Sequence, residues 1–130
     1  MTQQLDRVRE QALRQEIVQV CRMMHEKNLI AATDGNVSAR WTDEYLITTP
    51  AGVVKGLVEP DDLVVTDNYG QVAPEEVAPH NGYRPSAELR LHLEAYRQRP
   101  DIRAVVHAHP PITTALTVAG VSLAPCVLPE

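Results

Sequence analysis

The segment Ala104-Val105-Val106-His107-Ala108-His109-Pro110 places two histidines two positions apart, directly after a pair of valines. Its β-branched residues predict a strand that ends at the prolines. Side chains alternate between the faces of a strand at roughly 3.3 Å per residue, so His107 and His109 are expected on one face. Two neutral imidazoles at that spacing can bind one metal ion, which predicts a metal site at the end of this strand. The alternative is a pair of ordinary surface or half-buried histidines, since a His-x-His pattern is short.

The composition indicates one domain that can bury a core, and its negative charge favours a small-molecule partner. The chain has 130 residues, 44% of them hydrophobic, and a net charge of −5. That charge argues against a nucleic-acid or membrane surface, which would need a clustered positive field. No apolar stretch reaches the roughly 20 residues of a membrane helix, and no secretory signal is recognisable. Because the only cysteines are Cys21 and Cys126, a reducing cytoplasmic location is expected.

Hydrophobic periodicity predicts helices over residues 5–27 and 86–99, and a short one over residues 112–118. Asn28 suits the end of the first helix because Asn tolerates the left-handed conformation. Ser86 is the expected N-cap of the second helix, which would put Glu88 in its first turn.

Short alternating segments predict strands over residues 37–41, 45–49, 63–66, 104–109 and 121–123. The first two are close enough to form an antiparallel hairpin. Residues 73–85 are rich in proline and predict a long loop. The sequence therefore indicates an α/β protein with antiparallel strands.

Two glycine-containing loops precede and follow the predicted hairpin. The loop Thr33–Ser38 can expose backbone N–H groups around Gly35 and form an anion-binding concavity, although a plain turn is the alternative. The second loop, Pro50-Ala51-Gly52, could lie beside it. Both are candidates for binding a substrate.

Glu88 and three further histidines complete the set of candidate residues. Glu88 is either stabilised by the helix dipole or, if it faces His107 and His109, available as a metal ligand or proton carrier. Spacing alone leaves both readings open. His25 is expected on the surface, His80 in a solvated loop and His92 packed in the interior.

Four motifs in this order resemble the class II aldolase/adducin family: Gly35-Asn36-Val37-Ser38, Thr49-Pro50-Ala51-Gly52, Pro85-Ser86-Ala87-Glu88 and His107-Ala108-His109-Pro110. The resemblance implies one three-layer α/β/α domain over residues 1–130, with a largely antiparallel central sheet and without the C-terminal part of the family fold. It also implies a homotetramer with active sites between subunits.

The resemblance further implies one zinc ion per subunit. His107 and His109 match two of the family's three histidine ligands, and Glu88 matches the carboxylate that binds the resting metal and then acts as acid/base. The positions that match those holding the substrate phosphate are Gly35, Asn36, Gly52 and Ser86. The expected function is a zinc-dependent aldolase-type lyase of carbohydrate metabolism, acting on a small hydroxy-ketone or sugar phosphate, in which zinc polarises the carbonyl and stabilises an enediolate.

Three departures from the family pattern qualify this expectation. Ala51 and Ala87 stand where the family has hydroxyl residues, which predicts a weaker phosphate site or a different anion. The family's third histidine ligand lies downstream of the matched region, so weak zinc binding and little activity are expected from these residues alone. The alternatives are an adducin-like binding or assembly module, an inactive fragment, or an epimerase, dehydratase or decarboxylase of the same family. Manganese, iron or cobalt could replace zinc.

Overall fold

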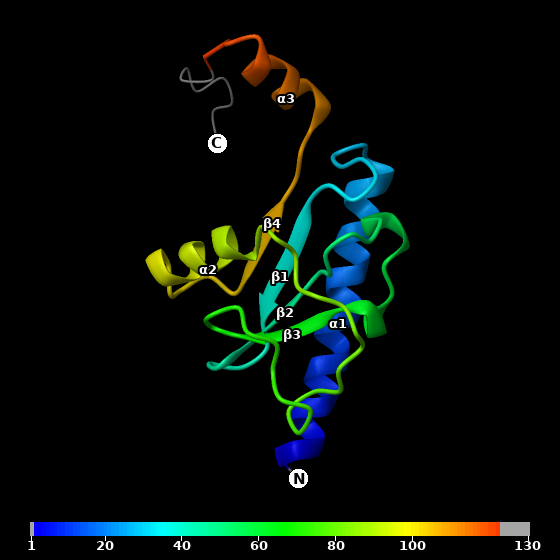
Figure 1. Cartoon of the computed structure of the whole chain (residues 1–130), viewed down its shortest axis with the longest axis vertical. Helices are drawn as coiled ribbons and strands as arrows, with labels where there is room; N and C mark the ends of the chain where they lie inside the picture. Colours follow the sequence, from blue (N-terminus) through cyan, green and yellow to red (C-terminus); the bar gives the residue numbers. More distant parts are fainter. Residues whose placement is uncertain (1, 123–130) are drawn as a thin grey trace.

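A four-stranded antiparallel sheet lies between two helices (Figure 1). The computed structural model describes residues 2–122, with side chains from residue 6 onward. The helices are α1 (Thr2–Glu26), α2 (Leu89–Gln98) and α3 (Pro111–Val118), with two short 3-10 helices, η1 (Lys55–Leu57) and η2 (Pro60–Asp62). The strands are β1 (Asn36–Arg40), β2 (Tyr45–Thr48), β3 (Val64–Asp67) and β4 (Ala104–His107), in the order β3-β2-β1-β4. The three-layer α/β/α arrangement is therefore confirmed.

The register of the strands sorts their side chains onto two faces. Ala39 is paired with Ile47, and Ile47 with Val65, so these three side chains share one face. The neighbouring pair, Ser38 and Thr48, points to the other face because side chains alternate along a strand. The first face is apolar and the second is largely polar.

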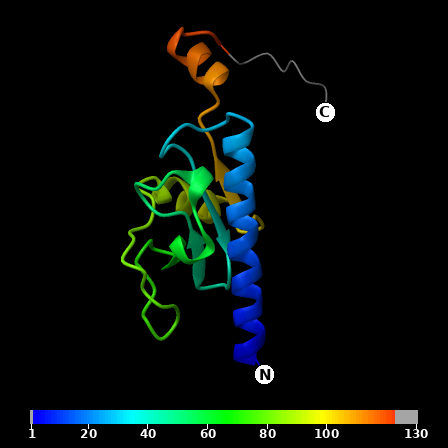
Figure 2. The same cartoon turned by 90° about the vertical axis from the view of Figure 1, so that its right-hand side faces the viewer.

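Helix α1 lies along the apolar face, and its N-terminal turns extend past the sheet (Figure 2). Its buried stripe includes Ile17, Cys21 and Met24, which pack against the sheet as the helical periodicity predicts. Burial raises the pKa of the Cys21 thiol to about 11, so this residue is a protonated core side chain. The helix ends at the predicted place, where Asn28 adopts a left-handed φ of 56°.

Helix α2 covers the other face, but its predicted start is wrong. The helix begins at Leu89, three residues after Ser86. Residues 86–89 instead form a tighter turn, in which the N–H of Leu89 donates to the carbonyl of Ser86 at 3.1 Å, while the N–H of Ser86 donates to the carbonyl of Thr49 at 3.1 Å. Glu88 consequently lies at the N-cap position, before the first helical turn.

The chain after β4 differs from the predicted strands. β4 ends at His107, and the N–H of His109 instead donates to the carbonyl of Leu29 at 3.0 Å. Residues 121 and 122 are not in a strand, and the rest of that predicted strand, like Cys126, lies outside the described residues.

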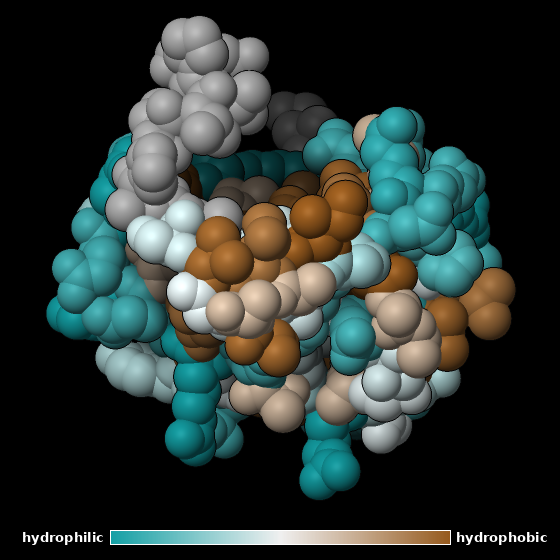
Figure 3. Space-filling model, turned by 90° about the horizontal axis from the view of Figure 1, so that it is seen from above, coloured by the Kyte–Doolittle hydropathy of each residue, from teal (hydrophilic) through white to brown (hydrophobic). Residues whose placement is uncertain are grey.

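Helix α3 ends at Val118 as predicted and begins at Pro111, one residue before the predicted start, and it contains no buried residue. Ile112 is 77% exposed and Val118 is 84% exposed, and Figure 3, which looks down on this end, shows hydrophobic side chains gathered there. β4 is an edge strand, and its Val106 is 54% exposed. No helix in the described part of the chain combines the length and apolarity that crossing a bilayer requires.

Candidate metal centre

The first glycine loop is packed directly against the end of β4. Asn36 is paired with His107 across the two strands, which brings the loop to the predicted metal ligands. Gly35 has a φ of +73°, and a Cβ there would lie 2.6 Å from Ile30 Cγ2 and 2.9 Å from the His107 carbonyl oxygen. Only glycine fits both this conformation and this approach.

The second glycine loop lies beside the first, as the sequence suggests. The Thr49 hydroxyl accepts the Val37 N–H at 3.1 Å, and the Val37 carbonyl accepts the Thr49 N–H at 3.0 Å. Gly52 also has a positive φ, +72°, but a Cβ there would meet nothing within 4 Å. Ser86 bonds to Thr49, and its hydroxyl accepts the Glu88 N–H at 3.3 Å, so the same contacts deliver Glu88 to the site.

Glu88, His107 and His109 converge at the end of β4. Each offers one ligand atom, and these atoms lie within 4.8 Å of one another. Glu88 Oε2 lies 3.4 Å from His107 Nδ1, and the two imidazole centroids are 4.8 Å apart. The side chain of Glu88 is 48% exposed and that of His107 26%, so the cluster is open to solvent. One carboxylate and two imidazoles are a donor set that suits zinc.

Asn36 connects this cluster to the interior. It is only 2% exposed, and its Nδ2 donates to Glu88 Oε2 at 2.6 Å. Its Oδ1 lies 2.5 Å from His92 Nε2 and 3.3 Å from His107 Nδ1. The side-chain amide therefore has partners at both ends, while its predicted contact with a substrate phosphate stays a prediction.

The contacts continue from Asn36 into the layer between β1 and α2. His92 Nδ1 lies 2.6 Å from Ser38 Oγ, which lies 2.9 Å from the Tyr96 hydroxyl. His92 is completely buried, and this burial lowers its pKa to about 4, so the ring is neutral at pH 7. Burial raises the pKa of Tyr96, whose ring lies 4.6 Å from the Arg40 guanidinium. We call Asn36, Ser38, His92 and Tyr96 the buried polar network.

His92 is packed in the interior as predicted, but hydrophobic periodicity does not predict its polar partners. The signal is present in a different pattern. Asn36 and Ser38 alternate on one side of β1, and His92 and Tyr96 are four residues apart on α2, hence on one helix face. These spacings put each pair on one face of its own element, and the hydrogen bonds show that the two faces meet in the same layer.

Lys55 is a second buried polar residue that periodicity does not predict. It is 2% exposed, and its Nζ donates to the carbonyls of Thr33 at 2.8 Å and Val53 at 2.9 Å. Burial lowers the pKa of its ammonium group. Because Thr33 and Val53 belong to or adjoin the two glycine loops, Lys55 ties these loops together.

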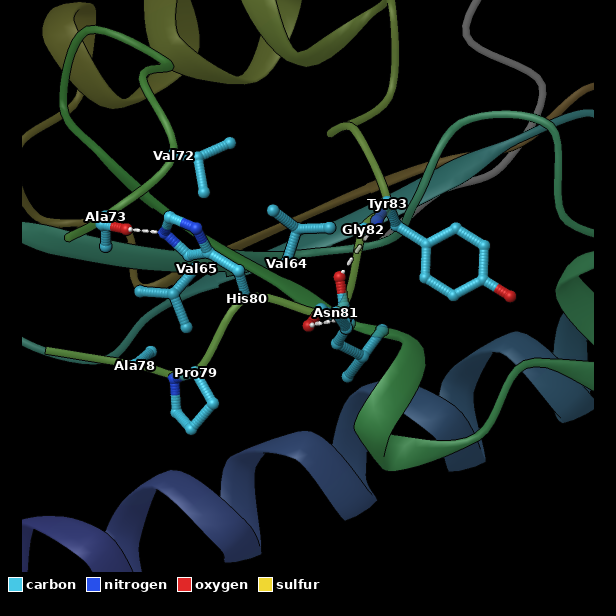
Figure 4. A pocket seen from close by; sticks show the side chains of 11 residues that line it. Val64, Val65, Val72, Ala73, Ala78, Pro79, His80, Asn81, Gly82 and Tyr83 are labelled. Atoms are coloured by element: carbon cyan, nitrogen blue, oxygen red, sulfur yellow. Dashed lines mark hydrogen bonds between the residues drawn. The ribbon is translucent and has the colours of Figure 1, made fainter. Parts of the chain in front are cut away.

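The remaining histidines lie outside the cluster. His25 and His80 are exposed, as predicted. His80 Nε2 lies 2.6 Å from the Ala73 carbonyl, and its ring lines a cavity of about 200 Å³ beside β3, together with Asn81 and Tyr83 (Figure 4). No residue lining this cavity belongs to the candidate metal centre.

Comparison with known proteins identifies the family. The family model described as Class II Aldolase and Adducin N-terminal domain matches residues 15–130. The chain is 37% identical over 111 residues to the 5-methylthioribulose-1-phosphate/5-deoxyribulose-1-phosphate aldolase of Escherichia coli O45:K1, covering 85% of this chain and 48% of that protein. It is 38% identical over 117 residues to the 3,4-dihydroxyphthalate decarboxylase of Arthrobacter keyseri, covering 88% and 47%.

A solved structure agrees with the sequence relatives. The L-fuculose-1-phosphate aldolase of Thermus thermophilus superimposes with a TM-score of 0.65 at 33% identity, covering 82% of this chain and 50% of that one. The chain thus spans about half the length of the relatives it matches.

Proposed function

Because the chain belongs to the class II aldolase and adducin family, we propose that the protein is a zinc-dependent aldolase-type lyase acting on a small hydroxy-ketone or sugar phosphate. The observation that carries this proposal is the convergence of Glu88, His107 and His109, whose ligand atoms lie within 4.8 Å of one another. The aldolase relative, which by its name acts on ketose 1-phosphates, supports the same substrate class.

In this proposal Glu88, His107 and His109 hold the zinc ion. Bound zinc would supply a Lewis acid for the carbonyl oxygen of the substrate. Glu88 acts as the acid/base, since its half-exposed carboxylate is accessible to a substrate while Asn36 holds one of its oxygens. General acid–base catalysis of this kind contributes about 10²–10⁴-fold to a rate.

The substrate-binding part of the proposal rests on the two glycine loops. The residues assigned to it are Gly35, Asn36, Gly52 and Ser86. Contacts to an anion would come mainly from backbone N–H groups and from the Ser86 hydroxyl, because Ala51 and Ala87 offer no hydroxyl and the Asn36 amide is already bonded.

A zinc titration tests the metal site. By calorimetry on the metal-free protein we expect weak binding of one zinc ion per chain, through Glu88, His107 and His109, and we expect His107→Ala to abolish this binding. His25→Ala is the matched control, because His25 is an exposed histidine outside the cluster. Zinc binding that is equal in the His107→Ala and His25→Ala variants would refute the zinc site.

The role of Glu88 is tested by Glu88→Gln, which keeps the size of the side chain and removes its proton-accepting charge. We expect zinc to remain largely bound and kcat for cleavage of a ketose 1-phosphate to fall about 10²–10⁴-fold. Unchanged kcat in this variant would exclude Glu88 as the acid/base.

Decarboxylation of a hydroxylated aromatic acid is the second candidate function. The 38% identity to a dihydroxyphthalate decarboxylase favours it, as do the two alanines that remove hydroxyl donors from the presumed phosphate site. Release of carbon dioxide from such acids, with no cleavage of ketose phosphates, would select this reaction over the aldolase reaction.

We also propose that the protein works as a homo-oligomer, with a tetramer as the family-based expectation. The open edge of β4 and the exposed apolar side chains of α3 support this proposal. Sedimentation analysis tests it. An adducin-like assembly module without turnover would instead show association together with no zinc binding and no activity.

A further inference from the structure

The orientation of the Asn36 amide determines where the protons lie throughout the site. Nδ2 of Asn36 faces the Glu88 carboxylate at 2.6 Å, and Oδ1 faces two imidazole nitrogens. An ionised carboxylate only accepts hydrogen bonds, and an amide oxygen also only accepts. The nitrogens that face Oδ1, His92 Nε2 and His107 Nδ1, must therefore both carry hydrogen.

The case for His107 is independent of His92. Its Nδ1 lies 3.3 Å from Asn36 Oδ1 and 3.4 Å from Glu88 Oε2, and both of these oxygens are acceptors. A lone pair on Nδ1 would face two other lone pairs. The favourable tautomer carries its hydrogen on Nδ1 and leaves the lone pair on Nε2, the only nitrogen of that ring then able to bind a metal ion.

Within the buried polar network the donor and acceptor of each hydrogen bond are fixed in the same way. His92 is neutral, so with hydrogen on Nε2 its Nδ1 must accept, and the Ser38 hydroxyl donates to it. Ser38 Oγ then accepts from the Tyr96 hydroxyl. Each hydrogen bond along this series of contacts thus has a single direction, from Tyr96 through Ser38 to His92, and from His92 through Asn36 to Glu88. The last of these bonds fixes the orientation of the Glu88 carboxylate.

We propose that Asn36 and His92 are positioning residues that fix the tautomer of His107 and the orientation of the Glu88 carboxylate. The inference rests on the proposed function, because it gives these two side chains a role in metal binding without contact to the metal. Partners of this kind typically change metal affinity by about 10–100-fold when they are removed.

The first test needs neither metal nor substrate. Long-range ¹H–¹⁵N NMR spectra of the metal-free, ¹⁵N-labelled protein distinguish protonated from unprotonated ring nitrogens, and single histidine substitutions assign the five imidazoles. We expect the hydrogen of His107 on Nδ1 and that of His92 on Nε2. Hydrogen on Nε2 of His107 or on Nδ1 of His92 would overturn the proposal, whether or not the protein binds zinc.

The second test compares two replacements of His92. His92→Leu removes the donor to Asn36, whereas His92→Gln supplies an amide N–H that can replace it. We expect about 10–100-fold weaker zinc binding in the Leu variant, with most of the loss recovered in the Gln variant. Equal zinc affinity in the Leu variant and the native protein would contradict the positioning role.

Leu93→Ala is the matched control for this comparison. Leu93 is a half-buried neighbour of His92 on α2, and it has no polar side-chain atom to contribute to the network. The variant loosens the helix packing without changing the network, so its zinc affinity and its tautomers should match those of the native protein. A loss as large as that in His92→Leu would attribute the effect to helix packing and reject the proposal.

If the protein binds no zinc while the NMR spectra show the expected tautomers, the proposed function fails and the ordering of protons by the network stands. If zinc binds with the opposite tautomer of His107, the metal site stands and this inference fails. The two proposals are therefore separable.

Discussion

The two faces of the sheet are built on different physical principles. The face toward α1 is an apolar core, in which Ile47 and Val65 pack against the helix and stability comes from removing hydrocarbon from water. The face toward α2 buries Ser38 and His92, which are satisfied by specific hydrogen bonds. In this protein one layer supplies stability, while the layer that adjoins the candidate metal ligands supplies hydrogen bonds of defined direction.

The largest change in stability is expected from a substitution on the apolar face. Ile47→Ala should lower the free energy of unfolding by about 2–5 kcal/mol, because it leaves a cavity in a fully buried site. Urea denaturation measures this loss. Under conditions where the variant is folded, its His107 tautomer and zinc affinity should be native. A change in either of these would show that the two faces are not independent.

An effect of similar size should come from pH and originate on the polar face. Burial lowers the pKa of His92 from 6.5 to about 4, so between these values the unfolded chain binds a proton that the folded protein excludes. Stability therefore falls as the pH falls through this window, by about 3 kcal/mol from His92 alone. Denaturation of the native protein and of His92→Gln at pH 7 and pH 4 isolates this contribution. Parallel losses in both proteins would contradict the assignment to His92.

The smallest of the three changes in stability is expected from a substitution that removes hydrogen bonds of the buried polar network. Ser38→Ala leaves His92 Nδ1 without its donor and the Tyr96 hydroxyl without its acceptor, and should cost about 1–3 kcal/mol. Thr66→Val is the control on the same face, because the buried Thr66 hydroxyl has no hydrogen-bond partner among the described residues. Its replacement should be neutral or slightly stabilising. Equal losses in the two variants would mean that the network adds nothing beyond the volume of its side chains.

The same contrast explains how much could be predicted from the sequence. The apolar face repeats at the period of its secondary structure, so α1, its end at Asn28 and the hairpin follow from local pattern. The polar face has no repeat of apolar residues that would mark it as buried. Polar residues that alternate along a strand are typical of a solvent-exposed side, and only the distant pair on α2 shows that Asn36 and Ser38 are buried.

The residues of the candidate site could be predicted from the sequence, but the contacts that hold them in place could not. The spacing of His107 and His109, together with the family resemblance, indicates the cluster that the structure brings together. The placement of the segment before Glu88 depends on the hydrogen bond from Ser86 to Thr49, a contact between segments far apart in sequence, and no local preference encodes it.

The two glycines of the candidate site differ in how readily another residue could replace them during evolution. Gly35 and Gly52 have nearly the same φ, but the space beside Gly35 is filled by Ile30 and the His107 carbonyl, whereas that beside Gly52 is empty. Asparagine tolerates this left-handed conformation, so the second loop can accept an asparagine at Gly52, next to the proposed substrate site. At the proposed substrate site, Gly52 is therefore a position that can change, whereas a side chain at Gly35 would displace Ile30 or the His107 carbonyl.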